Sequence, residues 1–331
     1  MTMNWDQLLC AERLGKRSAK HEEGRSPFHS DHDKIIFSGA FRRLARKTQV
    51  HPMATNDHIH NRMTHSLEVA CVGRTLGIRV GQALKDAGDL PSHIWPTDIG
   101  DIVQATCLAH DIGNPPFGHT GEDAIRSWFQ KDGAEFLADL SPEERDDIRI
   151  FEGNAQGLRV LTTSEYHQYH EGMRLTYATL SSSMKYPWCS TATVLNHRPK
   201  NNKYGVFQSE LDYFHEIAAK TGLIEKGKNW YCRHPLVYLM EAADDFCYGI
   251  IDLEDGLEMG ILNWAEIYEL LRPVIADSPQ LADLERTLKK VNDGRKPALV
   301  RGKVIDAFIN AGTDAFIKHQ DDFLNGTVEG D

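Results

Sequence analysis

The amino-acid sequence predicts an all-α protein that carries one small β-hairpin or extended insert. Apolar residues recur at the helical spacings of three and four through most of its 331 residues. Prolines, capping residues and glycines stand where such segments are expected to begin and end. The sequence contains no internal repeat, no low-complexity stretch and no clear linker between domains. These observations favour one helical domain with helical additions.

The first two predicted helices precede residue 90. Residues 31–48 carry a stripe of apolar side chains and are predicted as one helix. Residues 62–88 carry a second stripe, with Thr64 as the candidate cap and Gly88 as the candidate end. Both segments therefore have a face suited to a protein core.

The remaining elements follow in chain order. Residues 96–113 begin with a proline and end at a glycine break, and residues 141–163 suggest two short helices. Residues 188–210 contain threonine and valine before a polar turn, and they are the candidate hairpin or extended insert. Residues 233–260 predict a long apolar helix with embedded acids, and residues 261–320 continue as helices.

The charge of the chain is uneven. A net charge of −11 argues against a protein that coats nucleic acid electrostatically. Four basic residues nevertheless lie close together, namely Arg42, Arg43, Arg46 and Lys47. Such a patch on an acidic protein indicates a defined anionic ligand, although any one of these residues is more simply explained as part of a solvated helix face.

Nothing in the sequence predicts insertion into a membrane or secretion. No apolar run reaches the roughly 18 residues needed to cross a bilayer, and the first residues lack the apolar core of a secretory signal. The six cysteines are scattered without a Cys-x-x-Cys pair, which is typical of reduced, mostly buried thiols. We therefore expect a cytoplasmic protein with no membrane partner.

The long helix at residues 233–260 carries acids on a buried face. Asp244, Tyr248 and Asp252 follow one another at intervals of four residues, so they share one side of the helix. A buried carboxylate needs a cation, a metal ion or hydrogen-bond donors. Capping or an ion pair would explain one such acid, but two acids and a tyrosine in a row favour a binding site.

An adjacent His-Asp pair stands in the segment "LAHDIGNPPFGHTGE". Neighbouring residues of a helix diverge by about 100°, so His110 and Asp111 can converge only where the helix ends. With His65 and an aspartate of the late helix they form a set of imidazole and carboxylate donors. Such a set suits Mn²⁺, Fe²⁺ or Zn²⁺ and tolerates Mg²⁺. No cysteine lies nearby, which speaks against a structural zinc site.

Taken together, the chain resembles the HD-domain phosphohydrolases, and within them the deoxyguanosinetriphosphate triphosphohydrolase (dGTPase) family. The H…HD…D pattern indicates the superfamily alone, whereas several longer blocks in the family's order are specific for the narrower family. These blocks are "RSPFHSDHDKIIFSGAFRRLARKTQV" (25–50), "NRMTHSLEV" (61–69), "AHDIGNPPFGHTGE" (109–122), "FEGNAQGLRVL" (151–161), "LTYATL" (175–180), "KYP" (185–187) and "RHPLVYLMEAADDFCYGIIDLEDG" (233–256).

The resemblance implies an HD-domain helical bundle and a divalent metal ion as cofactor, either Mg²⁺ or Mn²⁺. Asp244 is preferred to Asp245 as a ligand because the family has a tyrosine four residues after this position, here Tyr248. The implied metal ligands are His65, His110, Asp111 and Asp244.

The resemblance also implies a catalytic pair, His119 and Glu122. Their spacing lets the carboxylate orient the imidazole if a helix starts near Thr120. His119 would then protonate the departing 5′ oxygen while water attacks the α-phosphorus. The products would be a deoxynucleoside and inorganic tripolyphosphate.

Further positions resemble substrate ligands of the family. Gln49 and Asn154 would contact the sugar or the base, although Asn154 can also be a helix cap and Gln49 a surface residue. Arg62 and Lys185 would bind phosphate oxygens, the guanidinium in a bidentate manner and the ammonium as a point charge.

The last two implied substrate residues lie on the acid-bearing helix. Tyr248 would pack against the sugar and exclude ribonucleotides, and Asp252 would lie near the sugar or orient Tyr248. Because the protein is acidic, a triphosphate needs a metal ion and local cations. The basic residues 42–47, together with Arg62 and Lys185, are expected to supply those cations.

Two features depart from the family pattern. Asn114 stands where many members have histidine, although asparagine can still donate a hydrogen bond. Residues 261–331 match the family only loosely, and the chain is expected to be shorter than its relatives at this end. We therefore expect an HD phosphohydrolase domain at residues 1–260 and a helical C-terminal region at residues 261–331.

The expected activity is hydrolysis of deoxynucleoside triphosphates, with dGTP preferred. One alternative is another HD-domain phosphohydrolase, such as a nucleotidase or phosphodiesterase. Another is a broad-specificity dNTPase that senses nucleotides or binds single-stranded nucleic acid. The family resemblance further suggests a homo-oligomer and single-stranded DNA as a second partner.

Overall fold

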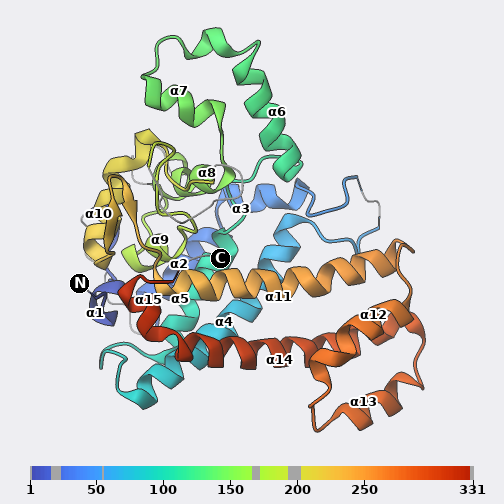
Figure 1. Ribbon diagram of the computed structural model, residues 1–331. Coiled ribbons are helices and arrows are strands. Elements are labelled where there is room, and N and C mark those ends of the chain that lie inside the picture. Colours follow the sequence, from blue (N-terminus) through green and yellow to red (C-terminus); the bar gives the residue numbers. More distant parts are fainter. Residues whose placement is uncertain (1, 16–23, 54–55, 166–171, 193–202, 329–331) are drawn as a thin grey trace.

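Helices packed on helices make up the protein (Figure 1), which confirms the all-α prediction. The computed structural model describes residues 2–15, 24–53, 56–165, 172–192 and 203–328. The helices are α1 (Trp5–Leu8), α2 (Pro27–Ile36), α3 (Gly39–Arg43), α4 (Arg62–Ala87), α5 (Pro96–Ala109), α6 (Gly118–Gln130), α7 (Pro142–Arg149), α8 (Gly153–Arg159), α9 (Tyr177–Ser182), α10 (Leu211–Thr221), α11 (Pro235–Glu258), α12 (Trp264–Leu271), α13 (Leu281–Leu288), α14 (Lys296–Lys318) and α15 (Gln320–Asn325). The strands are β1 (Glu225–Gly227) and β2 (Trp230–Tyr231), paired antiparallel.

The centre of the fold is the contact between α4 and α5. Two glycines of α4 allow the two backbones to approach closely. A Cβ atom on Gly77 would lie 2.9 Å from the Cα of Gly100, and one on Gly81 would lie 2.8 Å from the Cα of Pro96. Fully buried aliphatic side chains fill the space around this contact. Close packing without voids therefore holds the two helices in a single register.

Helices α11 and α14 cover this pair and run side by side (Figure 1). The end of α11 also packs on α12, α13 and the first half of α14 around Ile250, Ile267 and Val300. Further along α14, Ile309 and Phe316 join the main core. Residues 261–328 therefore share their packing with the preceding helices, and the boundary at residue 260 stays a prediction.

The single helix predicted for residues 31–48 is wrong. The segment forms α2, α3 and the short 3₁₀ turn η1 (Leu44–Arg46). The break falls at Ser38, whose hydroxyl accepts a hydrogen bond from the backbone N–H of Phe41 and caps α3. Serine competes for backbone donors in this way, and the apolar periodicity of a sequence does not reveal it.

The ends of α4 are partly as predicted. Gly88 ends the helix in the left-handed conformation, with φ +82°. At the other end Thr64 is not the cap, because the side chain of Asn61 accepts the N–H groups of Met63 and Thr64. The hydroxyl of Thr64 instead accepts the N–H of Asn61, which completes a capping box.

The predicted hairpin is displaced along the chain. Residues 193–202 of the predicted segment lie outside the described residues. Its described parts form isolated bridges, Trp188 with Trp230 and Cys189 with Val206, so they are extended. The two strands of the hairpin are β1 and β2, where Asn229 turns the chain with φ +55°. These strands have only three and two residues, which is too few for an alternating pattern to be recognised in the sequence.

The cysteines are as predicted. All six cysteines are free, and four of them are buried. None of the described helices combines the length and the apolar character that crossing a bilayer requires.

An ion-pair cluster fixes the start of α4 to α11. The imidazole of His60 lies with Nδ1 2.8 Å from Oδ1 of Asp255 and Nε2 3.3 Å from Oε2 of Glu68. Hydrogen bonding to Glu68, and then to Asp255, outweighs burial and raises the pKa of His60 to about 9. The segment that leads into α4 is thereby held against the acid-bearing helix.

We predict that this cluster makes stability depend on pH. A histidine with a raised pKa stabilises the fold fully below its unfolded pKa of about 6.5, and the effect is lost as pH rises through about 9. His60→Gln should therefore lower the free energy of unfolding by up to ~3 kcal/mol near pH 6 and by little at pH 10. Urea unfolding across this range measures it, with the exposed His319→Gln as control. A loss that does not change with pH would contradict the ionic origin.

Candidate metal and substrate site

A cavity of about 520 Å³ lies between the ends of α4 and α5, the start of α6, the helix α8 and the middle of α11. Nine of the twelve predicted site residues line it: Gln49, Arg62, His110, Asp111, His119, Asn154, Lys185, Asp244 and Tyr248. The other three each contact one of these. His65 meets Asp244, Glu122 meets His119, and Asp252 hydrogen-bonds to Tyr248. The structure therefore brings all twelve together.

The four predicted metal ligands converge from three elements. Nε2 of His65 lies 2.9 Å from Oδ1 of Asp244, and Nε2 of His110 lies 3.5 Å from the same oxygen. Nε2 of His110 also lies 3.6 Å from Oδ2 of Asp111. One donor atom from each of His65, His110 and Asp111 falls within 4.8 Å of the others. These three donors can hold one ion, and the carboxylate of Asp244 contacts both imidazoles beside them.

The end of α5 produces this convergence. The helix ends at Ala109, and His110 is its C-cap. Nδ1 of His110 donates to the carbonyl of Cys107 at 2.6 Å, which leaves Nε2 facing the acids. The chain then turns at Gly113, where a Cβ atom would lie 2.1 Å from the nitrogen of Gly157. Only glycine lets the turn rest on the backbone of α8.

The charged groups of this cluster shift one another's pKa values. Burial raises the pKa of Asp244, but His110 and His65 outweigh it and lower that pKa to about 2. Burial lowers the pKa of His110, but Asp111 and Asp244 outweigh it and raise it. In addition, Nδ1 of His65 is buried without a hydrogen-bond partner among the described residues. Two imidazoles and two carboxylates fit a divalent ion of the transition series or Mg²⁺.

Asn114 has a defined place in this cluster. Its side-chain amide donates to Oδ1 of Asp111, while Nη1 of Arg62 binds Oδ2 of the same carboxylate. The backbone carbonyl of Asn114 accepts a hydrogen bond from Lys47. Both oxygens of Asp111 are therefore held in place, which agrees with the expectation that asparagine can still donate a hydrogen bond here.

The predicted catalytic pair is in contact. Nδ1 of His119 lies 3.0 Å from Oε2 of Glu122. The side chain of Glu122 is 2% exposed whereas that of His119 is 83% exposed, so a buried carboxylate holds an accessible imidazole. Helix α6 begins at Gly118, two residues before the predicted start. The backbone N–H of Gly153 donates to Oε1 of Glu122 and fixes the carboxylate.

Comparison with known proteins identifies the family. The sequence profile of the HD domain matches residues 62–216. A deoxyguanosinetriphosphate triphosphohydrolase-like protein of Pseudomonas aeruginosa is 55% identical over 99% of this chain and 74% of its own length. The chain belongs to the dGTPase-like family of HD-domain proteins.

Two further relatives of this family are more distant. One from Synechocystis sp., with the same descriptive name, is 43% identical over 99% of this chain and 75% of its own length. The deoxyguanosinetriphosphate triphosphohydrolase of Enterobacter sp. is 35% identical over 81% of this chain and 57% of its own length. Family membership makes the chain an HD-domain phosphohydrolase, and its metal-ligand candidates are of the kind that HD domains use.

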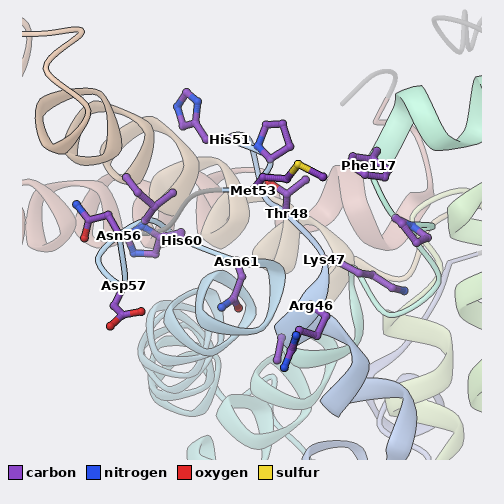
Figure 2. Close-up of a pocket in the computed structure, with 14 residues that line it drawn as sticks. Arg46, Lys47, Thr48, His51, Met53, Asn56, Asp57, His60, Asn61 and Phe117 are labelled. Carbon is purple, nitrogen blue, oxygen red and sulfur yellow. The ribbon is translucent and has the colours of Figure 1, made fainter.

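The basic residues predicted to serve the site in this dGTPase-like chain do not line its cavity. Arg42 and Arg43 are exposed, and Arg43 pairs with Glu165 at 3.6 Å. Arg46 and Lys47 line a second cavity of about 510 Å³ beside Met53 and Phe117 (Figure 2). Lys47 nevertheless donates to the backbone carbonyl of Asn114, which lies on the wall of the site cavity. That residues 42–47 supply cations to the site stays a prediction.

Lys203 is the cation that sequence reasoning missed. It lines the cavity with Arg62 and Lys185, and its ammonium lies 3.0 Å from Oε1 of Glu152. Lys203 lies in a polar segment that the sequence predicts to be a hairpin or extended insert. A lysine in such a segment is usually solvated, so the sequence does not mark it as a site residue. Glu152 is also on the cavity wall, and the block "FEGNAQ" was the one signal that pointed to it.

We predict that a divalent ion stabilises this protein through the four convergent residues. Mn²⁺ at 100 times its Kd should add about 2.7 kcal/mol to the free energy of unfolding, and a chelator should remove that gain. Asp244→Asn should abolish the response to Mn²⁺ in thermal melts. Asp245→Asn is the matched control, since the next residue on α11 is exposed. An equal response in both variants would contradict the ligand assignment.

Proposed function

We propose that the protein hydrolyses deoxynucleoside triphosphates to a deoxynucleoside and inorganic tripolyphosphate, with dGTP preferred. The contact that carries this proposal is His119 with Glu122, on the wall of the same cavity as the metal-ligand candidates. The names of the relatives support the substrate class, because they are called deoxyguanosinetriphosphate triphosphohydrolases or are described as similar to them.

His65, His110, Asp111 and Asp244 would hold Mg²⁺ or Mn²⁺. When bound, such an ion polarises phosphate oxygens and lowers the pKa of water, so that water becomes a nucleophile near neutral pH. The protein's own part is to keep the carboxylates in place. Arg62 and Asn114 do so for Asp111 through one hydrogen bond each.

The cations of the cavity would bind the phosphates. Arg62, Lys185 and Lys203 reach it from three different segments, namely α4, the stretch after α9 and the stretch before α10. A guanidinium can contact two phosphate oxygens at once, and each ammonium adds a point charge. Three cations on the wall of one cavity favour a ligand with several phosphate groups over a monophosphate.

His119 would transfer the proton to the leaving group. Because Nδ1 of its ring contacts Glu122, Nε2 is free to face the cavity. The accessible ring can reach the 5′ oxygen of a substrate whose phosphates lie against the cations. Protonation of that oxygen as its bond to phosphorus breaks would release a neutral deoxynucleoside.

The sugar and the base would lie toward Gln49, Asn154 and Tyr248. Oε1 of Gln49 is buried without a hydrogen-bond partner among the described residues, so it is available to a donor on the ligand. The hydroxyl of Tyr248 donates to the carboxylate of Asp252, and the ring lies half exposed at the cavity wall. A ring held in this way would exclude a 2′-hydroxyl by contact. Homo-oligomerisation and binding of single-stranded DNA stay predictions that rest on the family resemblance.

The decisive experiment identifies the products. The protein is incubated with each dNTP and with GTP, in the presence of Mg²⁺ or Mn²⁺, and the products are resolved by anion-exchange chromatography. We expect deoxyguanosine and tripolyphosphate from dGTP, with GTP left intact. Orthophosphate or pyrophosphate as the first phosphate product would instead support a nucleotidase or a phosphodiesterase.

We predict that His119→Ala lowers kcat by about 10²–10⁴-fold, because the general acid is lost. The same variant should keep its thermal response to Mn²⁺, since His119 is not among the metal-ligand candidates. His319→Ala is the control, because His319 contacts Asp322 at 3.2 Å with the same spacing of three residues, at the exposed end of α14. Wild-type turnover by His119→Ala would overturn the proton-transfer role.

A further inference from the structure

Glu152 is a fully buried carboxylate on the wall of the cavity. Its side chain has no exposed surface, yet it lies among residues that face the ligand space. It also caps α8 by accepting the backbone N–H of Asn154 at 3.5 Å, and it accepts the side-chain amide of Asn154 at 2.7 Å. One carboxylate thus fixes both the beginning of the helix and a residue proposed to contact the substrate.

Glu152 and Glu122 share two cations, and these four residues form what we call the charge box. The ammonium of Lys203 lies 3.0 Å from both oxygens of Glu152 but 3.7 Å from Oε2 of Glu122. Nη2 of Arg126 lies 3.5 Å from Oε2 of Glu152 and 3.5 Å from Oε2 of Glu122. Two negative and two positive charges balance, which burial requires.

The oxygen at the centre of the charge box is also the one that orients the imidazole. Oε2 of Glu122 faces Lys203 and Arg126 and accepts from Nδ1 of His119 at 3.0 Å. If Glu152 were neutral, Lys203 would have only Glu122 as a buried counter-charge, whereas Arg126 would keep its contacts with Asp123 and the carbonyl of Phe151. Lys203 would then move onto Oε2 and displace His119 from it.

We propose that Glu152 is a positioning residue that acts in two directions. It holds Lys203 at the cavity wall, where the ammonium meets the phosphates, and it keeps Lys203 from taking the carboxylate oxygen that His119 needs. The inference rests on the proposed function and adds to it a link between phosphate binding and proton transfer.

Glu152→Gln tests the proposal, because it keeps the shape of the side chain and removes its charge. We expect kcat for dGTP to fall at least about tenfold, since small misplacements of a catalytic group have effects of this order or larger. We also expect weaker binding of inorganic tripolyphosphate, measured by calorimetry in the presence of Mn²⁺. Glu152→Asp should recover part of both losses, because it restores a carboxylate.

A double-mutant cycle separates positioning from a general loss of structure. Lys203→Met removes the competing cation, so Glu152→Gln should cost less kcat in that background than in the wild type. Glu210→Gln is the matched control. Glu210 is buried and faces Arg159 of α8 at 3.7 Å, but it is not on the cavity wall. It should lower the melting temperature and leave kcat unchanged.

The outcomes are distinguishable. Wild-type kcat in Glu152→Gln, or effects of the two substitutions that multiply independently, would overturn the proposal. If the wild type releases no tripolyphosphate from any dNTP, the proposed function fails instead. Tripolyphosphate affinity then still tests the charge box, because Glu152→Gln must weaken that affinity if Glu152 positions Lys203.

Discussion

The close approach of two backbone segments supports the whole site. The turn after α5 lies directly on the first turn of α8, and a Cβ atom on Gly113 would lie 2.2 Å from the carbonyl oxygen of Gly153. A Cβ atom on Gly153 would in turn lie 2.4 Å from Oδ1 of Asn114 and 2.8 Å from Oε1 of Glu122. The metal-ligand candidates and the proposed proton-transfer pair therefore meet because glycine stands on both sides of this contact.

Each cation of the cavity in this acidic chain is already paired with a carboxylate. The ammonium of Lys185 lies 3.1 Å from Oε1 of Glu241. In the same way, Arg62 pairs with Asp111, and Lys203 pairs with Glu152. Each carboxylate offsets the cost of burying its cation and holds it in one place. The overall charge of −11 thus says little about the site, where the local arrangement of charges decides what can bind.

The sequence predicts the long helices well because their buried faces place apolar residues at regular helical spacings over many residues. The H…HD…D motif predicts that His65, His110 and Asp244 lie together as metal ligands. The structure brings these three side chains into contact. Lys203 could not be predicted, because only tertiary packing turns a lysine in a polar segment toward Glu152. The break at Ser38 could not be predicted from periodicity, because it depends on a local hydrogen bond from the N–H of Phe41 to one hydroxyl.

The glycine contacts between α4 and α5 also bear on how an ion would be exchanged. Gly77 and Gly81 lock the two helices that carry His65 and His110, so these donors lose little conformational entropy when an ion arrives. Metal uptake by such a preorganised cage does not require folding of the chain, in contrast to small zinc domains. If the site binds an ion as proposed, one divalent ion would replace another at little structural cost, and the supply of metals in the surroundings would govern which ion the protein carries.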